Sequence, residues 1–77
     1  MNKNRRNILS KCIEELEDIK SRIEDVRCDE EDAKDSMPES LQDTDRYYEM
    51  EDNCDEMDDA TGQIDDIIDI LQGIIEK

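Results

Sequence analysis

The side chains of this chain that could do chemistry are carboxylates and thiols, because the sequence contains no histidine. Its 25 aspartates and glutamates outnumber 10 lysines and arginines, and the net charge is −15. Two carboxylates can act as a general acid and a general base only where a pocket desolvates one of them and raises its pKa. Here the acids lie in open polar runs, and the sequence has no nucleophile elbow or phosphate-binding loop. We therefore expect no enzymatic activity.

Neither the thiols nor the acids match a metal-binding motif. Cys12, Cys28 and Cys54 form no Cys-x-x-Cys pair of the kind that zinc sites use. The stretch from Asp52 to Glu56 has oxygen ligands but lacks the glycine turn and the spacing of an EF-hand loop. We expect no metal and no cofactor. Cys12 and Cys54 fall on apolar stripes as small core residues, whereas Cys28 faces outward and is the expected reactive thiol.

The spacing of the apolar residues predicts the elements that position these side chains. Apolar residues make up 34% of the chain and recur every three or four positions on both sides of the only proline. We predict an all-α fold, an antiparallel two-helix hairpin resembling a coiled coil, as one domain over residues 1–77. The first helix covers about residues 4–35, the turn residues 36–43, and the second helix about residues 44–76. Pro38 ends the first helix, and Asp43 or Thr44 caps the second.

Each predicted helix carries one apolar stripe with heptad spacing. The stripe of the first helix is broken at Glu30, widened by Ile8 and Ile13, and consists of Leu9, Cys12, Leu16, Ile19, Ile23, Val26, Ala33 and Met37. The stripe of the second helix is widened by Ile67, Ile70 and Ile74, and consists of Tyr47, Met50, Cys54, Met57, Thr61, Ile64, Ile68, Leu71 and Ile75. A glycine costs about 1 kcal/mol in a helix interior. Gly62 is therefore a candidate for a kink or a split of the second helix.

The widened stripes near the chain termini predict self-association. A hairpin covers only one side of each helix, so these aliphatic residues would stay partly exposed in a monomer. Pairing with a second copy into a four-helix bundle would cover them. We predict a homodimer through the terminal ends, because the acidic turn ends repel each other. The interface residues are Leu9, Ile13, Ile67, Ile70 and Ile74.

Negative charge is concentrated in residues 24–59, which we call the acidic lobe. The lobe holds 17 acids against three bases, a net charge of −14, whereas residues 1–11 carry four bases and no acid. This distribution opposes the dipole of the first helix, so helix stability does not explain it. Folded back on itself, the lobe spans about 27 Å, or one net charge per ~2 Å. Duplex DNA carries one charge per ~1.7 Å.

This charge density favours a positively charged partner protein and opposes binding to nucleic acid or to an anionic membrane. The specific hypothesis is a DNA mimic that inhibits a larger protein by occupying its nucleic-acid channel. A simpler interpretation is that the acids are a solvated surface. An alternative function is structural or assembly work, in which the aliphatic terminal end binds a partner or a second copy. On the heptad frame, the outward carboxylates of the lobe are Glu24, Asp25, Glu31, Asp32, Asp35, Glu49, Asp52, Asp55, Glu56 and Asp59.

The turn carries a resemblance to a known group of proteins. The segment Met37-Pro38-Glu39-Ser40-Leu41-Gln42, with four residues between it and Tyr47 and an acidic heptad helix on each side, resembles small acidic helical-hairpin proteins of phages and prophages of Gram-positive bacteria. The resemblance implies a helical hairpin of mobile-element origin and carries over no functional residue. By analogy, such an origin implies an inhibitor of host defence of the anti-CRISPR or anti-restriction type.

The location of the protein is predicted from what the sequence lacks. The basic residues at the start are not followed by the apolar run of a signal peptide. No stretch approaches membrane-spanning length. We expect a soluble cytoplasmic protein with reduced thiols, in a bacterial host cell if the gene is phage-borne.

Overall fold

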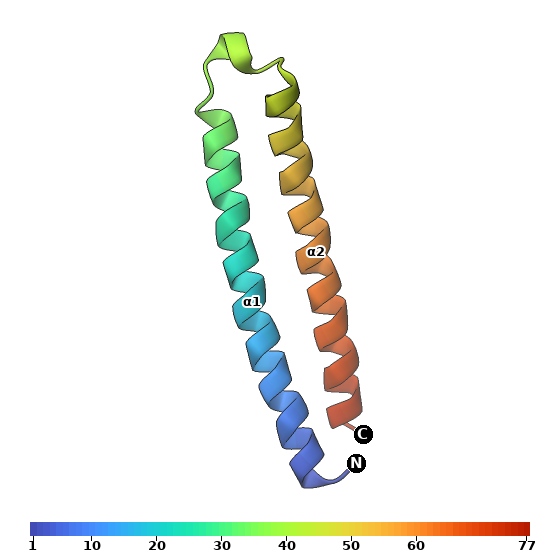
Figure 1. Cartoon of the computed structure of the whole chain (residues 1–77). Coiled ribbons are helices and arrows are strands. Elements are labelled where there is room, and N and C mark those ends of the chain that lie inside the picture. Colours follow the sequence, from blue (N-terminus) through green and yellow to red (C-terminus); the bar gives the residue numbers. More distant parts are fainter.

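Two long helices lying side by side make up almost the whole fold (Figure 1). The computed structural model describes all 77 residues as α1 (Lys3–Asp35), the 3-10 helix η1 (Glu39–Leu41) and α2 (Asp45–Ile75), with no strand. The predicted all-α antiparallel hairpin is confirmed, and both helices end within one residue of their predicted bounds. The molecule is a rod of 60 × 15 × 12 Å, with both termini at one end (Figure 1). Neither helix combines the length and the apolar character needed to cross a bilayer.

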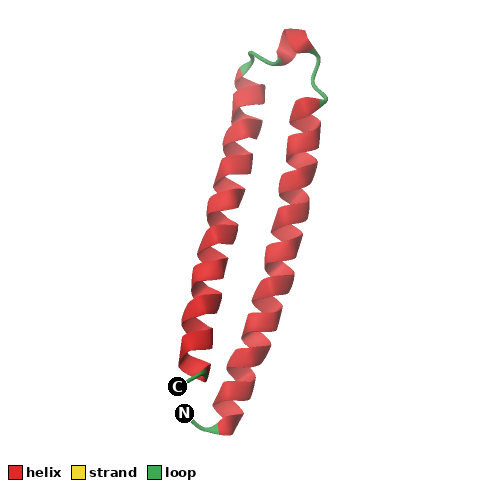
Figure 2. Ribbon diagram, turned by 180° about the vertical axis from the view of Figure 1, so that it is seen from behind, coloured by secondary structure: helices red, strands yellow, loops and turns green.

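Local hydrogen bonds set the helix starts and the turn. The Asn2 side chain accepts a backbone N–H three residues further on at 2.8 Å, which caps α1. Thr44, one of the two residues predicted to cap α2, accepts the backbone N–H of Tyr47 with Oγ1 at 3.4 Å. Between the helices, the carbonyl of Pro38 accepts the N–H of Leu41 at 2.8 Å and closes η1, flanked by two short loops (Figure 2).

The core is a narrow seam between the helices. Only Ile13, Cys54 and Ile68 are fully buried. On α2, every residue of the predicted stripe, from Tyr47 to Ile75, is buried or half-buried. The predicted stripe of α2 is therefore confirmed at all of its positions.

The predicted stripe of α1 is wrong in its central part. Three of its apolar residues are exposed instead of packed: Ile19, Val26 and Ala33. The half-buried residues that face α2 are the cations one position further along: Lys20, Arg27 and Lys34. One position corresponds to a rotation of about 100° around the helix. The physical reason is that Lys20 and Arg27 reach acids of α2 and Lys34 lies over the ring of Tyr47, while their aliphatic stems cover the seam.

Helix α2 continues through Gly62 without a break (Figures 1 and 2). Gly62 does not have a positive φ, so the backbone does not require glycine there. A Cβ added to Gly62 would meet no atom within 4 Å. The structure therefore has neither the kink nor the split that this glycine could have caused.

Replacing Gly62 with alanine is expected to stabilise the hairpin. In a helix interior, alanine is more favourable than glycine by about 1 kcal/mol. The site also has room for the methyl group. For a domain of this size the change corresponds to a rise in Tm of roughly 4–8 °C. Thermal unfolding followed by circular dichroism measures it, with Gly73→Ala in the last turns of α2 as a control that has a smaller effect. An unchanged or lower Tm for Gly62→Ala would contradict the open surroundings of this residue.

Candidate functional site

The acidic lobe forms the half of the rod next to the turn, with carboxylates contributed by both helices. The sequence-predicted carboxylate Glu31 is half-buried, while the other nine are exposed: Glu24, Asp25, Asp32, Asp35, Glu49, Asp52, Asp55, Glu56 and Asp59. The antiparallel arrangement brings the α1 set beside the α2 set, since the two helices run together up to η1 (Figure 1). The structure therefore gathers the predicted residues into one region.

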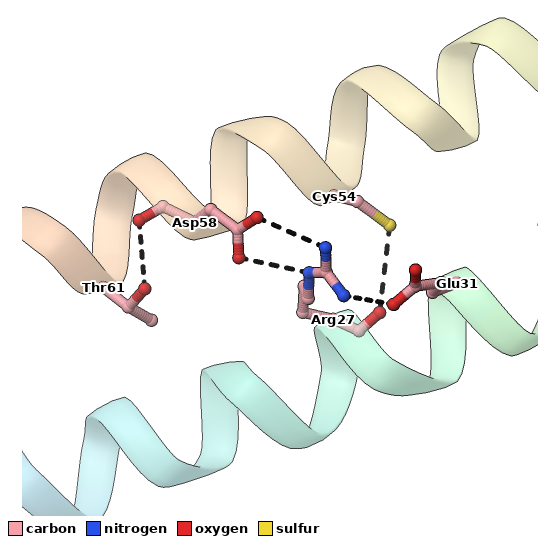
Figure 3. A network of polar contacts seen from close by, with 5 residues as sticks. All are labelled: Arg27, Glu31, Cys54, Asp58 and Thr61. Carbon is pink, nitrogen blue, oxygen red and sulfur yellow. Dashed lines mark hydrogen bonds and ion pairs between the residues drawn. The ribbon is translucent and has the colours of Figure 1, made fainter.

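Arg27 is the centre of the ion pairing inside the lobe (Figure 3). Its guanidinium donates from Nε to Asp58 Oδ1 at 3.1 Å and from Nη2 to Asp58 Oδ2 at 3.3 Å, which is a two-point contact between the helices. Nη1 also donates to the carboxylate of Glu31, one turn away on α1. The hydrogen bond that Arg27 donates to Asp58 is the main cause that raises the pKa of Arg27. The Arg27 carbonyl accepts from Cys54 Sγ at 3.8 Å, which ties the core thiol to the same turn.

Lys20 repeats this contact seven residues earlier on α1. Its Nζ lies 2.8 Å from Asp65 Oδ1 on α2 and 4.0 Å from Glu24 Oε1. The hydrogen bond with Asp65 is the main cause that raises the pKa of Lys20. About three turns beyond Lys20, the half-buried Glu30 accepts a hydrogen bond from Asn53 Nδ2 at 3.0 Å, so the polar residue that interrupts the predicted stripe has a partner on α2.

Most carboxylates of the lobe have no cationic neighbour. Of its 17 acids, only Glu24, Glu31 and Asp58 take part in an ion pair. The other 14 have no base within ion-pair distance. Such an arrangement attracts cationic surfaces at long range and repels polyanions.

The cross-helix ion pairs were missed by reasoning from the sequence. Their signal was present as two matched seven-residue intervals, from Lys20 to Arg27 on one helix and from Asp58 to Asp65 on the other. Charged residues beside an apolar stripe usually face solvent. The sequence pattern therefore places Lys20 and Arg27 on the surface and not between the helices. Predicting these ion pairs requires knowing which residues of α2 lie opposite each residue of α1.

The carboxylates of the lobe lie on an open surface. No group of three or more cysteine, aspartate or glutamate side chains is arranged to hold a metal ion. The largest hollow, about 500 Å³, is an open polar depression beside the Arg27–Asp58 contact, so it leaves its carboxylates in contact with water. Hydrated carboxylates at fixed positions suit recognition by a cationic partner.

The three thiols lie in different environments. Cys28 is exposed, Cys12 is half-buried and Cys54 is buried. Burial of Cys54 is the main cause that raises the pKa of its thiol, because an ionised sulfur is disfavoured away from water. The outward position predicted for Cys28 is confirmed, and its reactivity stays a prediction.

Thiol titration with a disulfide reagent at mildly alkaline pH is expected to separate Cys28 from Cys54. Cys28 should react at the rate of a free thiol, whereas Cys54 should react at least about 100-fold more slowly, because its thiolate is both less populated and covered. Cys28→Ser should remove the fast phase and leave the slow phase unchanged. Equal rates for the two thiols in the folded protein would contradict the burial of Cys54.

Salt is expected to stabilise the folded protein. Screening weakens the repulsion among 14 unpaired carboxylates more than it weakens four partly exposed ion pairs. Raising NaCl from about 20 to about 500 mM should therefore raise the Tm by roughly 5 °C or more. A variant with Asp52→Asn, Asp55→Asn, Glu56→Gln and Asp59→Asn should show a smaller salt effect. A Tm that falls with salt would mean that the ion pairs outweigh the repulsion.

The predicted oligomer-interface residues lie in three different environments. Ile67 and Ile70 are exposed, with 45% and 63% of their surface accessible. Ile74 and Leu9 are half-buried. Ile13 is buried inside the hairpin, 8% exposed, where it packs in the seam. The part of this set that is available to a second molecule therefore lies mainly on α2.

Comparison of the chain with protein-family models, curated proteins and solved structures found no significant match. The resemblance of the turn to phage and prophage proteins stays a prediction. The function must be inferred from the charge and the exposed surfaces of this chain.

Proposed function

We propose that the protein binds a positively charged nucleic-acid-binding protein through the acidic lobe and thereby excludes nucleic acid from that protein. The observation that carries this proposal is the set of 14 carboxylates without a cationic neighbour in one half of a 60 Å rod. These carboxylates do not stabilise the fold, because they repel one another and those on α1 oppose its helix dipole. A cationic partner would relieve this repulsion.

The rigidity of the two helices supports the proposal. Asp25 and Asp32 lie seven residues apart on α1, as Asp52 and Asp59 do on α2, so each pair recurs at about 10.5 Å along the rod. All four are exposed. Backbone hydrogen bonds hold these rows in place before any partner arrives, which limits the entropy lost on binding. Phosphates of a duplex are likewise presented in rows on a stiff scaffold, and a groove built for them would accept carboxylates at similar density.

The exposed aliphatic residues favour a second candidate function, structural or assembly work through the terminal end. Ile67 and Ile70 are large, exposed and far from the acidic lobe. Binding through such residues would depend little on salt, whereas binding through the lobe weakens as salt screens the charges. Salt dependence therefore separates the two candidates.

The test is affinity capture from a bacterial lysate, followed by competition with nucleic acid. We expect the wild-type chain to retain a DNA- or RNA-binding protein, and the purified pair to lose affinity by at least about tenfold between 50 and 200 mM salt. Duplex DNA or RNA should displace the chain from that protein. The lobe variant, with Asp52→Asn, Asp55→Asn, Glu56→Gln and Asp59→Asn, should lose the interaction.

A matched variant removes four charges outside the lobe: Glu14→Gln, Glu17→Gln, Asp18→Asn and Asp66→Asn. These side chains are exposed, so both variants should keep the helical content of the wild type. The proposal predicts that the matched variant binds like the wild type. Equal loss in both variants would indicate a response to net charge alone. A captured protein that nucleic acid does not displace would refute the proposal.

A further inference from the structure

One side of the hairpin is apolar from the terminal end to beyond its middle. Ile19 and Val26 lie seven residues apart on α1, as Ile67 and Ile74 do on α2, and residues at this spacing share one face of a helix. On α1, Lys20 and Arg27 point to acids of α2, and the residues before them, Ile19 and Val26, are exposed. On α2, Ile67 is exposed and Ile74 is half-buried. We call this surface the lateral face, whose largest side chains are Ile8, Ile19, Val26, Ile67, Ile70 and Ile74.

The lateral face is open to solvent in the isolated chain. Ile8 and Val26 are 55% and 57% exposed. Its middle contains a groove of about 390 Å³ between the helices, lined by Ile19, Arg22, Ile23, Val26, Met57 and Ala60. The remaining exposed large apolar side chains of the two helices and the turn, Leu41 and Tyr48, lie at the other end of the molecule. The aliphatic exposure is therefore concentrated on one side.

The molecule exposes more surface than a compact monomer of the same mass. The accessible surface is 5780 Å². A compact folded monomer of 9.1 kDa has about 4900 Å² by the usual scaling with mass. The excess of about 900 Å² follows from the elongated 60 × 15 × 12 Å shape, which leaves a long side of the hairpin uncovered. A stable protein–protein interface buries roughly 800 Å² on each partner.

We infer that the lateral face binds the lateral face of a second copy, with the two hairpins antiparallel, to form a four-helix bundle. A parallel pair would place two acidic lobes, each with a net charge of −14, beside one another. An antiparallel pair separates the lobes to opposite ends of the assembly. It also brings the four bases of residues 1–11 of each copy toward the lobe of the other copy.

Charged residues at the edge of the lateral face fit this orientation. Glu15 and Arg22 lie one turn on either side of Ile19 and are both exposed. Antiparallel pairing about the middle of the lateral face places Arg22 of each copy beside Glu15 of the other, on both sides of the symmetry axis. The edge of the face is therefore self-complementary in charge.

This dimer goes beyond the proposed function and does not depend on it. The lateral face contains none of the four carboxylates that the lobe variant changes, and those four side chains are exposed. Loss of dimerisation and loss of partner binding can therefore be told apart, because the lobe variant should still dimerise.

The first experiment measures mass by sedimentation equilibrium at micromolar concentration in high salt. The wild type and the lobe variant should both have twice the 9.1 kDa mass of the chain. The double variant Ile67→Gln, Ile70→Gln should weaken dimerisation at least about 100-fold. Since both isoleucines are exposed in the monomer, circular dichroism should show a folded helical chain. The control Leu41→Gln, Tyr48→Gln removes exposed apolar groups elsewhere and should dimerise like the wild type.

A wild-type monomer under these conditions would overturn the inference. A folded isoleucine variant that dimerises as tightly as the wild type would overturn it equally, as would a different protein occupying the lateral face of a monomeric chain.

The second experiment tests the orientation by swapping charges. Glu15→Arg should weaken the dimer by about three- to tenfold, because it places arginines opposite one another. Adding Arg22→Glu should restore the wild-type dissociation constant. Glu15 and Arg22 are too far apart along one helix to contact each other, so the rescue reports a contact between copies. A double variant no tighter than the single one would rule out the antiparallel pairing.

Discussion

The pairing of Lys20 with Asp65 and of Arg27 with Asp58 sets the rotation of α1 about its axis. Two rotations would pack α1 against α2 with similar backbone geometry. One buries the isoleucine and valine stripe, and the other buries the stems of the cations. Each ion pair is partly exposed and contributes little to stability by itself. Together they select the second rotation, which leaves a polar side and an apolar side on one rod.

This selection explains why the two helices were not equally predictable from the sequence. Helix α2 has a single apolar register, so its stripe from Tyr47 to Ile75 was read correctly at every position. Helix α1 has two overlapping registers. Both contain Leu9, Cys12, Leu16, Ile23 and Met37, and they differ by one position at Ile19, Val26 and Ala33. Hydrophobic periodicity within the helix favours the register with Ile19, Val26 and Ala33, which is the one predicted, because lysine and arginine are not counted as apolar. The choice depends on Asp58 and Asp65 of α2. Which residues of α1 they lie opposite is fixed only when the turn has formed.

The acidic lobe was predictable for a different reason. Carboxylates are rarely buried, so the helix period was sufficient to place nine of the ten predicted residues on the surface. Glu31 was the exception because Arg27, one turn away, draws it toward the helix interface. The turn was also well specified, since Pro38 cannot continue a helix and Thr44 is a favourable cap. Local chemistry therefore fixed the ends of the helices, while contacts between helices fixed their faces.

The position of the turn at the most highly charged end also influences how the chain folds. Contacts beside η1 close loops of about ten residues, whereas contacts near the termini close loops of about fifty-five, a difference of roughly 1.5 kcal/mol in closure entropy. Entropy therefore favours zipping outward from the turn. Repulsion within the lobe opposes those early contacts, and the buried Ile13 and Ile68 lie far from the turn. The folding order of the rod is thus a competition between chain entropy at one end and hydrophobic burial at the other, and ionic strength shifts the balance.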